Sequence, residues 1–502
     1  MMLLDKFLET TLQNLGAPAC IFEGKVMSRA QFLNMVCQFA LALHERGVQP
    51  GETVGVSLHH APVHLALILA LARLGAISLP VHPRSPPRNK LRLMKQFGAR
   101  RVVTVPPPAN APERTSQSPE VEVIRINELK PKAAPTQGGA RMDLRGMLDY
   151  WPTPDTLGRI GLTSGTTGFP NAVCYTHAYW LHRILNTVEH CDESTRLMPG
   201  NLHLTMGNIS AFAALLAGGV VVFHKQRQIE SYISSIQLYA VTHAMTSPAT
   251  IKDLAAALPL EGNAFPSIRY LRIVGGGLSE NLVTLAKRHL TPNIWLPYGI
   301  SEVGAISMAD PALLDSNPDY AGRPKPGVQV EVVSPEGKVL GPGEIGELRV
   351  RVPEMPAEYY MNPERTAEKF RDGWFYTNDI GTVTSDGLVR LEGRSDDRIN
   401  LGGLKLYPER VEAVLNSHPD VRDSGVFTVS DKDGNKVLVA AVVLKQADQP
   451  VSDMVEFCKE RKLGGMTPRR FFIVKELPRN EAGKLMRAAL PELLRRRDES
   501  VH

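Results

Sequence analysis

Cysteine is scarce in this sequence, and no two cysteines form a paired motif. The five cysteines are scattered over 502 residues without a Cys-x-x-Cys pair. That usage is typical of a reducing compartment and argues against a disulfide framework or a zinc site. The N-terminus also lacks the charged region and apolar core of a signal peptide. We therefore expect a cytoplasmic location.

Long apolar runs and a large excess of one charge are absent too. The most apolar early run, residues 65–72, is short and is followed by Arg73. It predicts a buried helix and not a membrane span. The 57 Lys and Arg against 52 Asp and Glu leave a net charge of +5, without a basic stripe interleaved with aromatic residues. We expect neither a membrane span nor a nucleic-acid partner.

The length and periodicity of the chain predict an α/β protein with more than one domain. Apolar positions at helical spacing alternate with short strands. The predicted elements are helices at 28–47, about 62–74 and 89–97, and strands at 53–57, 76–81 and 101–105. Such alternation is typical of a parallel sheet covered by helices on both faces.

Three later stretches depart from this pattern. Residues 106–140 are polar and rich in proline, and they predict a flexible surface insertion. From 321 to 393, short strands with Pro-Glu-Gly, Gly-Pro-Gly and Ser-Asp-Gly turns predict an antiparallel β subdomain. The pattern after 397 is that of a small α+β domain. We predict a large N-terminal domain at 1–393 and a C-terminal domain at 398–502.

The sequence Thr-Ser-Gly-Thr-Thr-Gly-Phe-Pro at 163–170 forms a loop after a predicted strand. Glycine allows the backbone to approach a ligand closely, and successive N–H groups with hydroxyls form a surface that suits phosphate. The loop lacks the lysine of a P-loop and the spacing of a dinucleotide fingerprint. Alone, it fits a phosphate site or a hydroxyl-rich surface turn.

Four further motifs favour the phosphate site. They are Tyr-Gly-Ile-Ser-Glu at 298–302, Trp-Phe-Tyr-Thr-Asn-Asp-Ile-Gly at 374–381, Gly-Arg-Ser-Asp-Asp at 393–397 and Pro-Arg-Asn-Glu-Ala-Gly-Lys at 478–484. In order and spacing, the five motifs resemble those of the adenylate-forming superfamily. That superfamily includes acyl- and aryl-CoA synthetases, nonribosomal peptide synthetase adenylation domains and firefly luciferase. The chain looks most like a stand-alone acyl- or aryl-CoA ligase.

The resemblance implies a ligase reaction in two halves. A carboxylate attacks the α-phosphate of ATP to give an acyl-adenylate and pyrophosphate, and a thiol then displaces AMP. ATP, Mg²⁺ and CoA are the implied cofactors, and a small-molecule carboxylic acid is the implied substrate. Catalysis of this kind depends on positioning and neutralising phosphate oxygens.

The resemblance also implies the nucleotide-binding residues. The phosphates would be bound by Thr163, Ser164, Gly165, Thr166, Thr167 and Gly168. Adenine would lie among Gly276, Gly277, Leu278, Tyr298 and Gly299, because stacking on an aromatic ring is a general way to hold a base. Asp379 would bind the ribose hydroxyls, and Arg394 would assist at the ribose or phosphate.

Catalysis and domain movement are assigned in the same way. Glu302 would hold Mg²⁺, Ser301 would donate to the α-phosphate, and Thr167 would share in catalysis. Lys484 would bridge the carboxylate and the α-phosphate. A mobile C-terminal domain would rotate about a hinge at 394–397, centred on Asp396. Rotation would bring the CoA-side residues Gly402, Gly403 and Lys405 to the active site.

The acyl pocket is expected among residues 203–212, 275–278 and 298–306. Its candidate residues are His203, Leu204, Gly207, Gly304 and Ala305, and the small ones favour a ring or a medium chain. Leu204 stands where the superfamily usually has histidine, so either the register slips by one or the pocket is remodelled. We favour remodelling, because a slip would reverse the faces of a strand.

Two departures leave other functions open. Asn171 replaces a lysine and Asn378 a glycine that most members of the superfamily carry, and loss of the lysine favours a catalytically degenerate nucleotide-binding protein. Retention of Thr167, Glu302 and Lys484 opposes that alternative. The acyl group could also pass to a separate carrier protein's phosphopantetheine thiol, since no fused carrier domain is found. Asn208, in place of an acidic anchor, argues against an amino-acid substrate.

The substitution Asn171→Lys tests the first departure. We expect it to lower the Michaelis constant for ATP, because lysine restores a positive charge beside the γ-phosphate or pyrophosphate. Initial rates with ATP as the varied substrate measure the effect. An unchanged constant would mean that position 171 does not lie at the phosphates.

Overall fold

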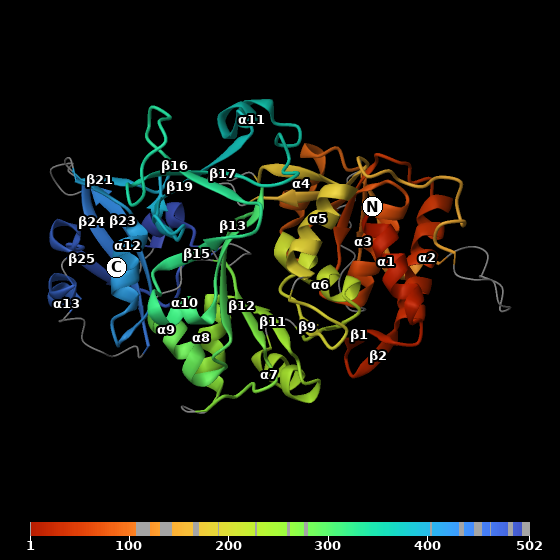
Figure 1. Ribbon diagram of the computed structural model, residues 1–502, viewed down its shortest axis with the longest axis horizontal. Coiled ribbons are helices and arrows are strands. Elements are labelled where there is room, and N and C mark those ends of the chain that lie inside the picture. The colour runs from red at the N-terminus through yellow and green to blue at the C-terminus, as the bar shows by residue number, and fades with distance from the viewer. Residues whose placement is uncertain are drawn as a thin grey trace, which may run out of the picture.

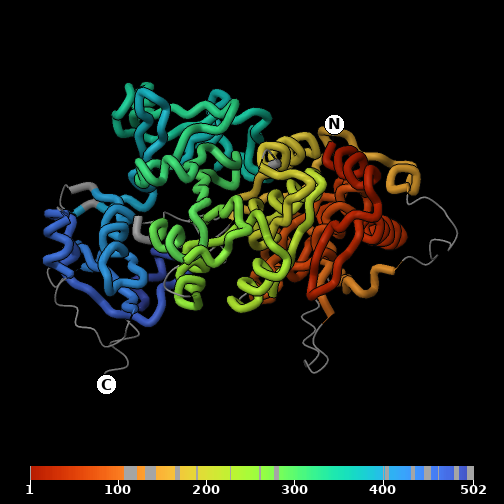
Figure 2. Tube along the Cα trace, turned by 60° about the horizontal axis from the view of Figure 1, so that its bottom comes forward, coloured from red at the N-terminus to blue at the C-terminus, as the bar shows by residue number. Residues whose placement is uncertain are grey.

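The computed structural model arranges the chain in three regions, which Figures 1 and 2 show from two sides. The N-terminal α/β region runs from red to green, a β region in teal lies above it, and the C-terminal domain in blue lies at one end. The structure describes residues 2–106, 121–130, 143–163, 170–188, 190–225, 228–258, 262–275, 280–401, 404–430, 436–445, 454–461, 463–479 and 485–493.

A six-stranded sheet forms the first half of the N-terminal domain. In spatial order its strands are β6 (Glu122–Arg125), β5 (Arg101–Thr104), β3 (Thr53–Ser57), β4 (Ile77–Pro80), β7 (Leu157–Leu162) and β8 (Ala172–Thr176). All neighbours are parallel except β7 and β8, which form an antiparallel pair. This arrangement confirms the predicted alternation of strands and helices.

Helices cover both faces of this sheet. One face packs in a large core with helices α1 (Leu3–Gln13), α2 (Arg29–Glu45), α3 (Pro62–Arg73), α5 (His177–Val188) and α6 (Thr205–Leu216). The other packs against α4 (Pro87–Gln96). The apolar run at 65–72 lies in α3 and is completely buried, as predicted. None of the helices in the described ranges is long and apolar enough to cross a membrane.

Part of the stretch predicted as a flexible insertion is a strand instead. Residues Glu122–Arg125 form β6, which pairs in parallel with β5 at the edge of the sheet. Ile124 is completely buried, whereas Val123 is 42% exposed. The alternation in Val-Glu-Val-Ile-Arg is a strand pattern, which the surrounding prolines concealed. Residues 107–120 and 131–142 of the same stretch lie outside the described residues.

A second strand path connects the rest of the N-terminal domain. It runs in parallel through β1 (Pro18–Phe22), β10 (Val220–Val222), β9 (Arg196–Met198), β11 (His243–Thr246), β12 (Tyr270–Ile273) and β13 (Ile294–Ile300), with β2 (Lys25–Ser28) at its edge. Helices α7 (Ile229–Leu238), α8 (Pro248–Ala257) and α9 (Glu280–His289) share a core with these strands.

Beyond β13, the neighbouring strands of this sheet are antiparallel, and they form the β region. Its strands are β14 (Gly304–Ala309), β15 (Tyr320–Pro324), β20 (Val389–Arg394), β19 (Trp374–Val383), β17 (Gly346–Arg351) and β16 (Gln329–Val333), with β18 (Phe370–Arg371) beside β19. Helices α10 (Pro311–Ser316) and α11 (Pro363–Lys369) are short. The antiparallel strands predicted after residue 321 are therefore present.

The C-terminal domain has the predicted α+β order. Strands β23 (Val421–Ser430), β24 (Lys436–Leu444) and β25 (Arg470–Ile473) form a sheet that packs with helices α12 (Pro408–Asn416) and α13 (Met454–Glu460), next to the hairpin β21 (Ile399–Leu401) and β22 (Leu404–Leu406). Two ion pairs, one partly buried and one exposed, connect this domain to α8. Lys252 lies 3.8 Å from Asp423, and Asp253 lies 3.7 Å from Arg422.

The position of β6 predicts different effects for two adjacent substitutions. We expect Ile124→Ala to lower the free energy of unfolding by about 2–5 kcal/mol, because it removes a completely buried side chain. Val123→Ala, on the exposed face, should change it by less than about 0.5 kcal/mol. Urea unfolding of the full chain measures both. Equal effects would mean that this segment does not belong to the core.

Candidate active site

The predicted phosphate loop joins two antiparallel strands. Thr163 follows β7, is 6% exposed, and donates its N–H to the carbonyl oxygen of Asn171 at 2.9 Å. β7 and β8 therefore form an antiparallel hairpin, and the predicted loop is the segment of chain between them. Of its predicted phosphate ligands, Ser164, Gly165, Thr166, Thr167 and Gly168 lie outside the described residues.

Asn171 has a partner within the protein. Its Oδ1 accepts a hydrogen bond from Nδ2 of Asn362 at 3.1 Å. Asn362 in turn caps α11, since its Oδ1 accepts from the N–H of Arg365 at 3.1 Å. Asparagine at 171 thus joins the hairpin to α11, and this contact gives the residue a structural role apart from phosphate.

Three predicted nucleotide residues from distant motifs meet in the structure. The hydroxyl of Tyr298 on β13 donates to Oδ2 of Asp379 at 2.7 Å, and Nη1 of Arg394 donates to Oδ1 at 2.9 Å. Asp379 on β19 and Arg394 on β20 are cross-strand partners. Tyr298 and Asp379 are 9% and 7% exposed. Burial, followed by the charge of Asp379, raises the pKa of Tyr298, so its hydroxyl stays protonated and donates.

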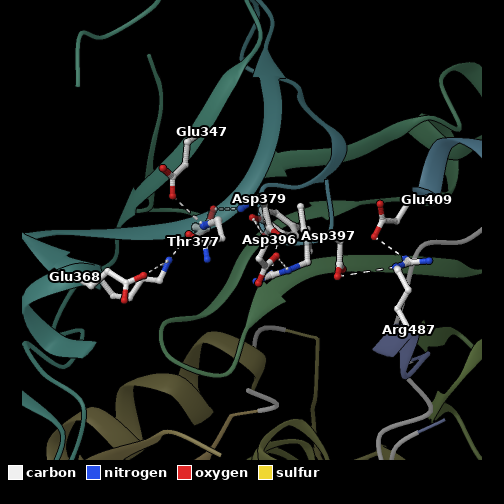
Figure 3. Close-up of polar contacts among 12 residues, drawn as sticks. Glu347, Glu368, Thr377, Asp379, Asp396, Asp397, Glu409 and Arg487 are labelled. Carbon is white, nitrogen blue, oxygen red and sulfur yellow. Dashed lines mark hydrogen bonds and ion pairs between the residues drawn. The ribbon is translucent and has the colours of Figure 1, made fainter. Parts of the chain in front are cut away.

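Arg394 also binds the predicted hinge residue. Its Nε and Nη2 donate to the two carboxylate oxygens of Asp396 at 2.9 and 3.0 Å. Figure 3 shows how the polar contacts continue toward the C-terminal domain, where Asp397 lies 3.9 Å from Arg487. Arg487 in turn binds Glu409 at 3.0 Å. Side chains on both sides of the predicted hinge are thus charge-paired.

Asn378, beside Asp379, has the backbone conformation expected at a glycine position. Its φ is 62°, in the left-handed region that asparagine tolerates better than most residues. Its N–H donates to Oε1 of Glu347 at 3.0 Å, and its Oδ1 accepts from Nζ of the buried Lys369. These bonds fix the turn that presents Asp379.

The turn with Ser301 and Glu302 connects β13 to β14. The carbonyl oxygen of Ser301 accepts from the Tyr175 hydroxyl at 3.0 Å and from Nη1 of Arg183 at 3.1 Å. Arg183 also donates to the Tyr175 hydroxyl at 2.6 Å. The two supporting residues come from β8 and α5. Sequence reasoning missed them, because contacts over more than 110 positions leave no local pattern.

A tyrosine holds the carboxylate of Glu302. The hydroxyl of Tyr359 donates to Oε1 at 2.7 Å. Burial raises the pKa of Glu302, and this hydrogen bond opposes the increase because it favours the charged form. A carboxylate oriented in this way fits the oxygen ligands that Mg²⁺ prefers. Tyr359 was not found from the sequence either.

The predicted acyl-pocket residues do not all meet. A recess beside α6 is lined by Gly304 and Ala305 together with Arg183, Met206 and Ile209. Gly304 has a φ of 91°, and a Cβ there would lie 3.0 Å from Nε of Arg183. A larger residue would therefore displace the arginine.

His203, Leu204 and Gly207 are not among the residues that line this recess. His203 contacts the carbonyl oxygen of Leu58 through Nε2 at 2.7 Å, and Leu204 is 37% exposed. The strand-face reason for a remodelled pocket was wrong, because Leu204 is the N-cap of α6 and the segment continues as a helix.

For the remaining predicted site residues, the structure describes the backbone alone, or they lie outside the described part of the chain. Gly299 is in β13, beside Tyr298. Lys405 is in β22, and its side chain is not described. Outside the described residues are Gly276, Gly277, Leu278, Gly402, Gly403 and Lys484.

Comparison with known families identifies the chain. The family model described as AMP-binding enzyme matches residues 7–360, and that of the AMP-binding enzyme C-terminal domain matches residues 410–484. The chain belongs to the AMP-binding enzyme family. The resemblance to adenylate-forming enzymes is thereby confirmed.

Named relatives agree with this family. A 2-succinylbenzoate–CoA ligase of Bacillus licheniformis is 33% identical over 342 residues, which cover 67% of this chain and 70% of the ligase. A fatty acid–[acyl-carrier-protein] ligase, ScoC, of Streptomyces coeruleorubidus is 26% identical over 489 residues, covering 94% and 92%. The predicted class of enzyme, an AMP-forming acid–thiol ligase, is confirmed.

A solved structure confirms the fold class. The o-succinylbenzoate CoA synthetase of Bacillus subtilis, in complex with its acyl-adenylate intermediate, matches with a TM-score of 0.85. The match covers 97% of each chain at 23% sequence identity. The shared fold is a large N-terminal α/β domain with a smaller C-terminal domain.

The bond between Tyr359 and Glu302 predicts a pH effect. Tyr359→Phe removes a hydrogen bond to the ionised carboxyl, so the pKa of Glu302 rises further. The proton then competes with Mg²⁺ up to a higher pH. We expect the acidic limb of the profile of kcat/KM against pH, measured with MgATP, to move upward by about one unit.

Tyr360→Phe is the matched control for this substitution. Tyr360 is the next residue, and its ring stacks on Phe97. Its profile should coincide with that of the unmodified chain. A Tyr359→Phe profile that also coincides would show that Glu302 does not limit activity at low pH.

Proposed function

We propose that this protein activates a carboxylic acid with ATP as an acyl-adenylate and then transfers the acyl group to the thiol of CoA. The observation that carries the proposal is the meeting of Tyr298, Asp379 and Arg394 in a chain of this family. Pyrophosphate leaves in the first half-reaction, and AMP leaves in the second.

The nucleoside would be held at Asp379. Asp379 accepts hydrogen bonds from Tyr298 and Arg394, and because a carboxylate can accept more than two, it would also accept from the ribose hydroxyls. The buried ring of Tyr298 would pack beside adenine, with Gly276, Gly277, Leu278 and Gly299 around the base. Arg394 pairs with the Asp379 carboxylate and orients it.

The phosphates would be bound between the β7–β8 hairpin and the turn before β14. We assign Thr163, Ser164, Gly165, Thr166, Thr167 and Gly168 to the phosphate oxygens, and Ser301 to the α-phosphate. Glu302 would hold Mg²⁺, which neutralises phosphate charge when bound. Lys484 would bring its ammonium group to the carboxylate and the α-phosphate.

The C-terminal domain would rotate between the half-reactions. We propose a hinge at 394–397, between a domain at 1–393 and one at 398–502. The proposal is supported by the hydrogen bonds from Arg394 to Asp396, which lie at this boundary. Rotation about Asp396 requires its bidentate bond to Arg394 to rearrange. Gly402, Gly403 and Lys405 would then face the thiol substrate.

For the acid, we propose an aromatic ring or a medium chain. The recess beside Gly304 and Ala305 would receive the part next to the carboxylate. One relative is named for 2-succinylbenzoate, which agrees with an aromatic acid. The five free cysteines support the cytoplasm as our proposed location.

A carrier-protein thiol is the second candidate acceptor, because the relative ScoC is named for an acyl-carrier protein. The degenerate alternative is weakened by the contact of Asn171 with Asn362, which explains the asparagine without a loss of catalysis.

The deciding measurement is AMP release from ATP and Mg²⁺ with aromatic, short-, medium- and long-chain acids, with and without CoA. We expect CoA-dependent AMP release with an aromatic or medium-chain acid. It should fall at least a hundredfold in Lys484→Ala and stay unchanged in Lys475→Ala, an exposed lysine.

Other outcomes distinguish the alternatives. Acid-dependent exchange of pyrophosphate into ATP without a CoA product would assign a carrier protein as the acceptor. ATP binding without AMP release for any acid would overturn the ligase and leave the degenerate protein.

A further inference from the structure

A buried arginine lies outside all of the residues assigned above. Arg159, in the middle of β7, is 1% exposed. Its Nε, Nη1 and Nη2 have no hydrogen-bond partner among the described residues. A guanidinium group carries five N–H donors, and a buried charge without compensation is strongly unfavourable. Such a group indicates an acceptor that the described residues do not supply.

The charge of Arg159 acts on two histidines, His64 and His203. The rings of His64 on α3 and His203 lie 4.7 Å apart between centroids. His203 bonds to the carbonyl oxygen of Leu58 through Nε2, and His64 bonds to that of His59 through Nδ1. These nitrogens therefore carry the protons. The opposite nitrogens, Nδ1 of His203 and Nε2 of His64, are buried acceptors without a partner in the described part of the chain.

The charges in this cluster point to an anion. Burial, and to a smaller extent the charge of Arg159, lower the pKa of both histidines, to about 3 for His203. Burial lowers the pKa of Arg159 to about 10, so the guanidinium stays charged at neutral pH. Tyr175 is the titratable side chain that favours its charged form, and no carboxylate of the described residues hydrogen-bonds to it. The cluster is thus one cation beside two neutral rings.

Tyr175 and Arg183 connect Arg159 to the recess beside Gly304 and Ala305. Arg159 and Tyr175 are cross-strand partners on β7 and β8, and the Tyr175 hydroxyl binds Arg183, which lines the recess. Arg159 also lies four residues before Thr163, the first residue of the predicted phosphate loop. Arg183 differs from Arg159 because it already donates to Tyr175 and Ser301.

We propose that Arg159 binds a second carboxylate, carried at the far end of the acid that the enzyme activates. The fork of N–H groups matches the two oxygens of a carboxylate, and His64 and His203 offer acceptors to a water or a protonated oxygen beside it. Arg159 is then a residue that selects dicarboxylic acids. The inference rests on the proposed function, whose first carboxylate reacts with ATP at the other end of the site.

The test compares acids in matched pairs. Octanedioate is paired with octanoate, and 2-succinylbenzoate with a benzoate whose side chain ends in a methyl ketone. The unmodified chain should have the higher kcat/KM for AMP release with at least one diacid. Arg159→Met should reduce that value at least tenfold, mainly through KM, while the monoacid value stays within twofold. Arg159→Lys should restore part of it.

Arg73→Met is the matched control for loss of a buried arginine. Arg73 is completely buried, but its guanidinium donates to backbone carbonyl oxygens, among them those of Leu144 and Leu148. This variant should lower the unfolding temperature without changing the ratio between diacid and monoacid. A similar loss for both acids in Arg159→Met, or no loss for either, would overturn the proposal.

A binding measurement on the unmodified chain tests the proposal even if the variants do not fold or the enzyme shows no turnover. The unfolding temperature of the unmodified chain is measured with each diacid, its matched monoacid, sodium acetate and sodium chloride. A larger increase with a diacid supports the proposal, whether or not AMP is released. An equal increase with acetate or chloride, without a further effect of the diacid, would assign Arg159 to a free anion and overturn the substrate role. No increase with any of them would overturn the site.

Discussion

The carboxylate of Asp379 is the contact on which the candidate site depends. It lies where the parallel strands of the N-terminal domain have given way to the antiparallel β region, and it accepts bonds from Tyr298 on one side and Arg394 on the other. Arg394 is the last residue of β20 and also binds Asp396. The proposed nucleoside site and the connection to the C-terminal domain therefore share one arginine, so a change at either alters the other.

Local patterns were sufficient for much of the fold. The helix Pro62–Arg73 and the strand Thr53–Ser57 agree with the predicted ends to within one residue, because proline at a helix start and alternating valines are local signals. The strand β6 was missed because its five-residue pattern lies within a proline-rich stretch. The β7–β8 hairpin was not predicted, because the strand after the loop is followed at once by α5.

The candidate site could be predicted in part. Motif residues such as Tyr298 and Asp379 were found because a family pattern marks them, and the structure brings them together. Tyr175, Arg183 and Tyr359 hold the Ser301–Glu302 turn from positions far away in the chain, and only the fold reveals such contacts. Arg159 belongs to the strand predicted before the loop, and only the structure shows that its guanidinium has no hydrogen-bond partner among the described residues.

Two ion pairs join α8 to the C-terminal domain. Arg422 and Asp253 are each 56% exposed, and Lys252 and Asp423 are partly accessible to water. Pairs of this kind contribute little and are screened by salt. For the domain rotation that we propose, ionic strength is therefore an external control on how readily this contact breaks.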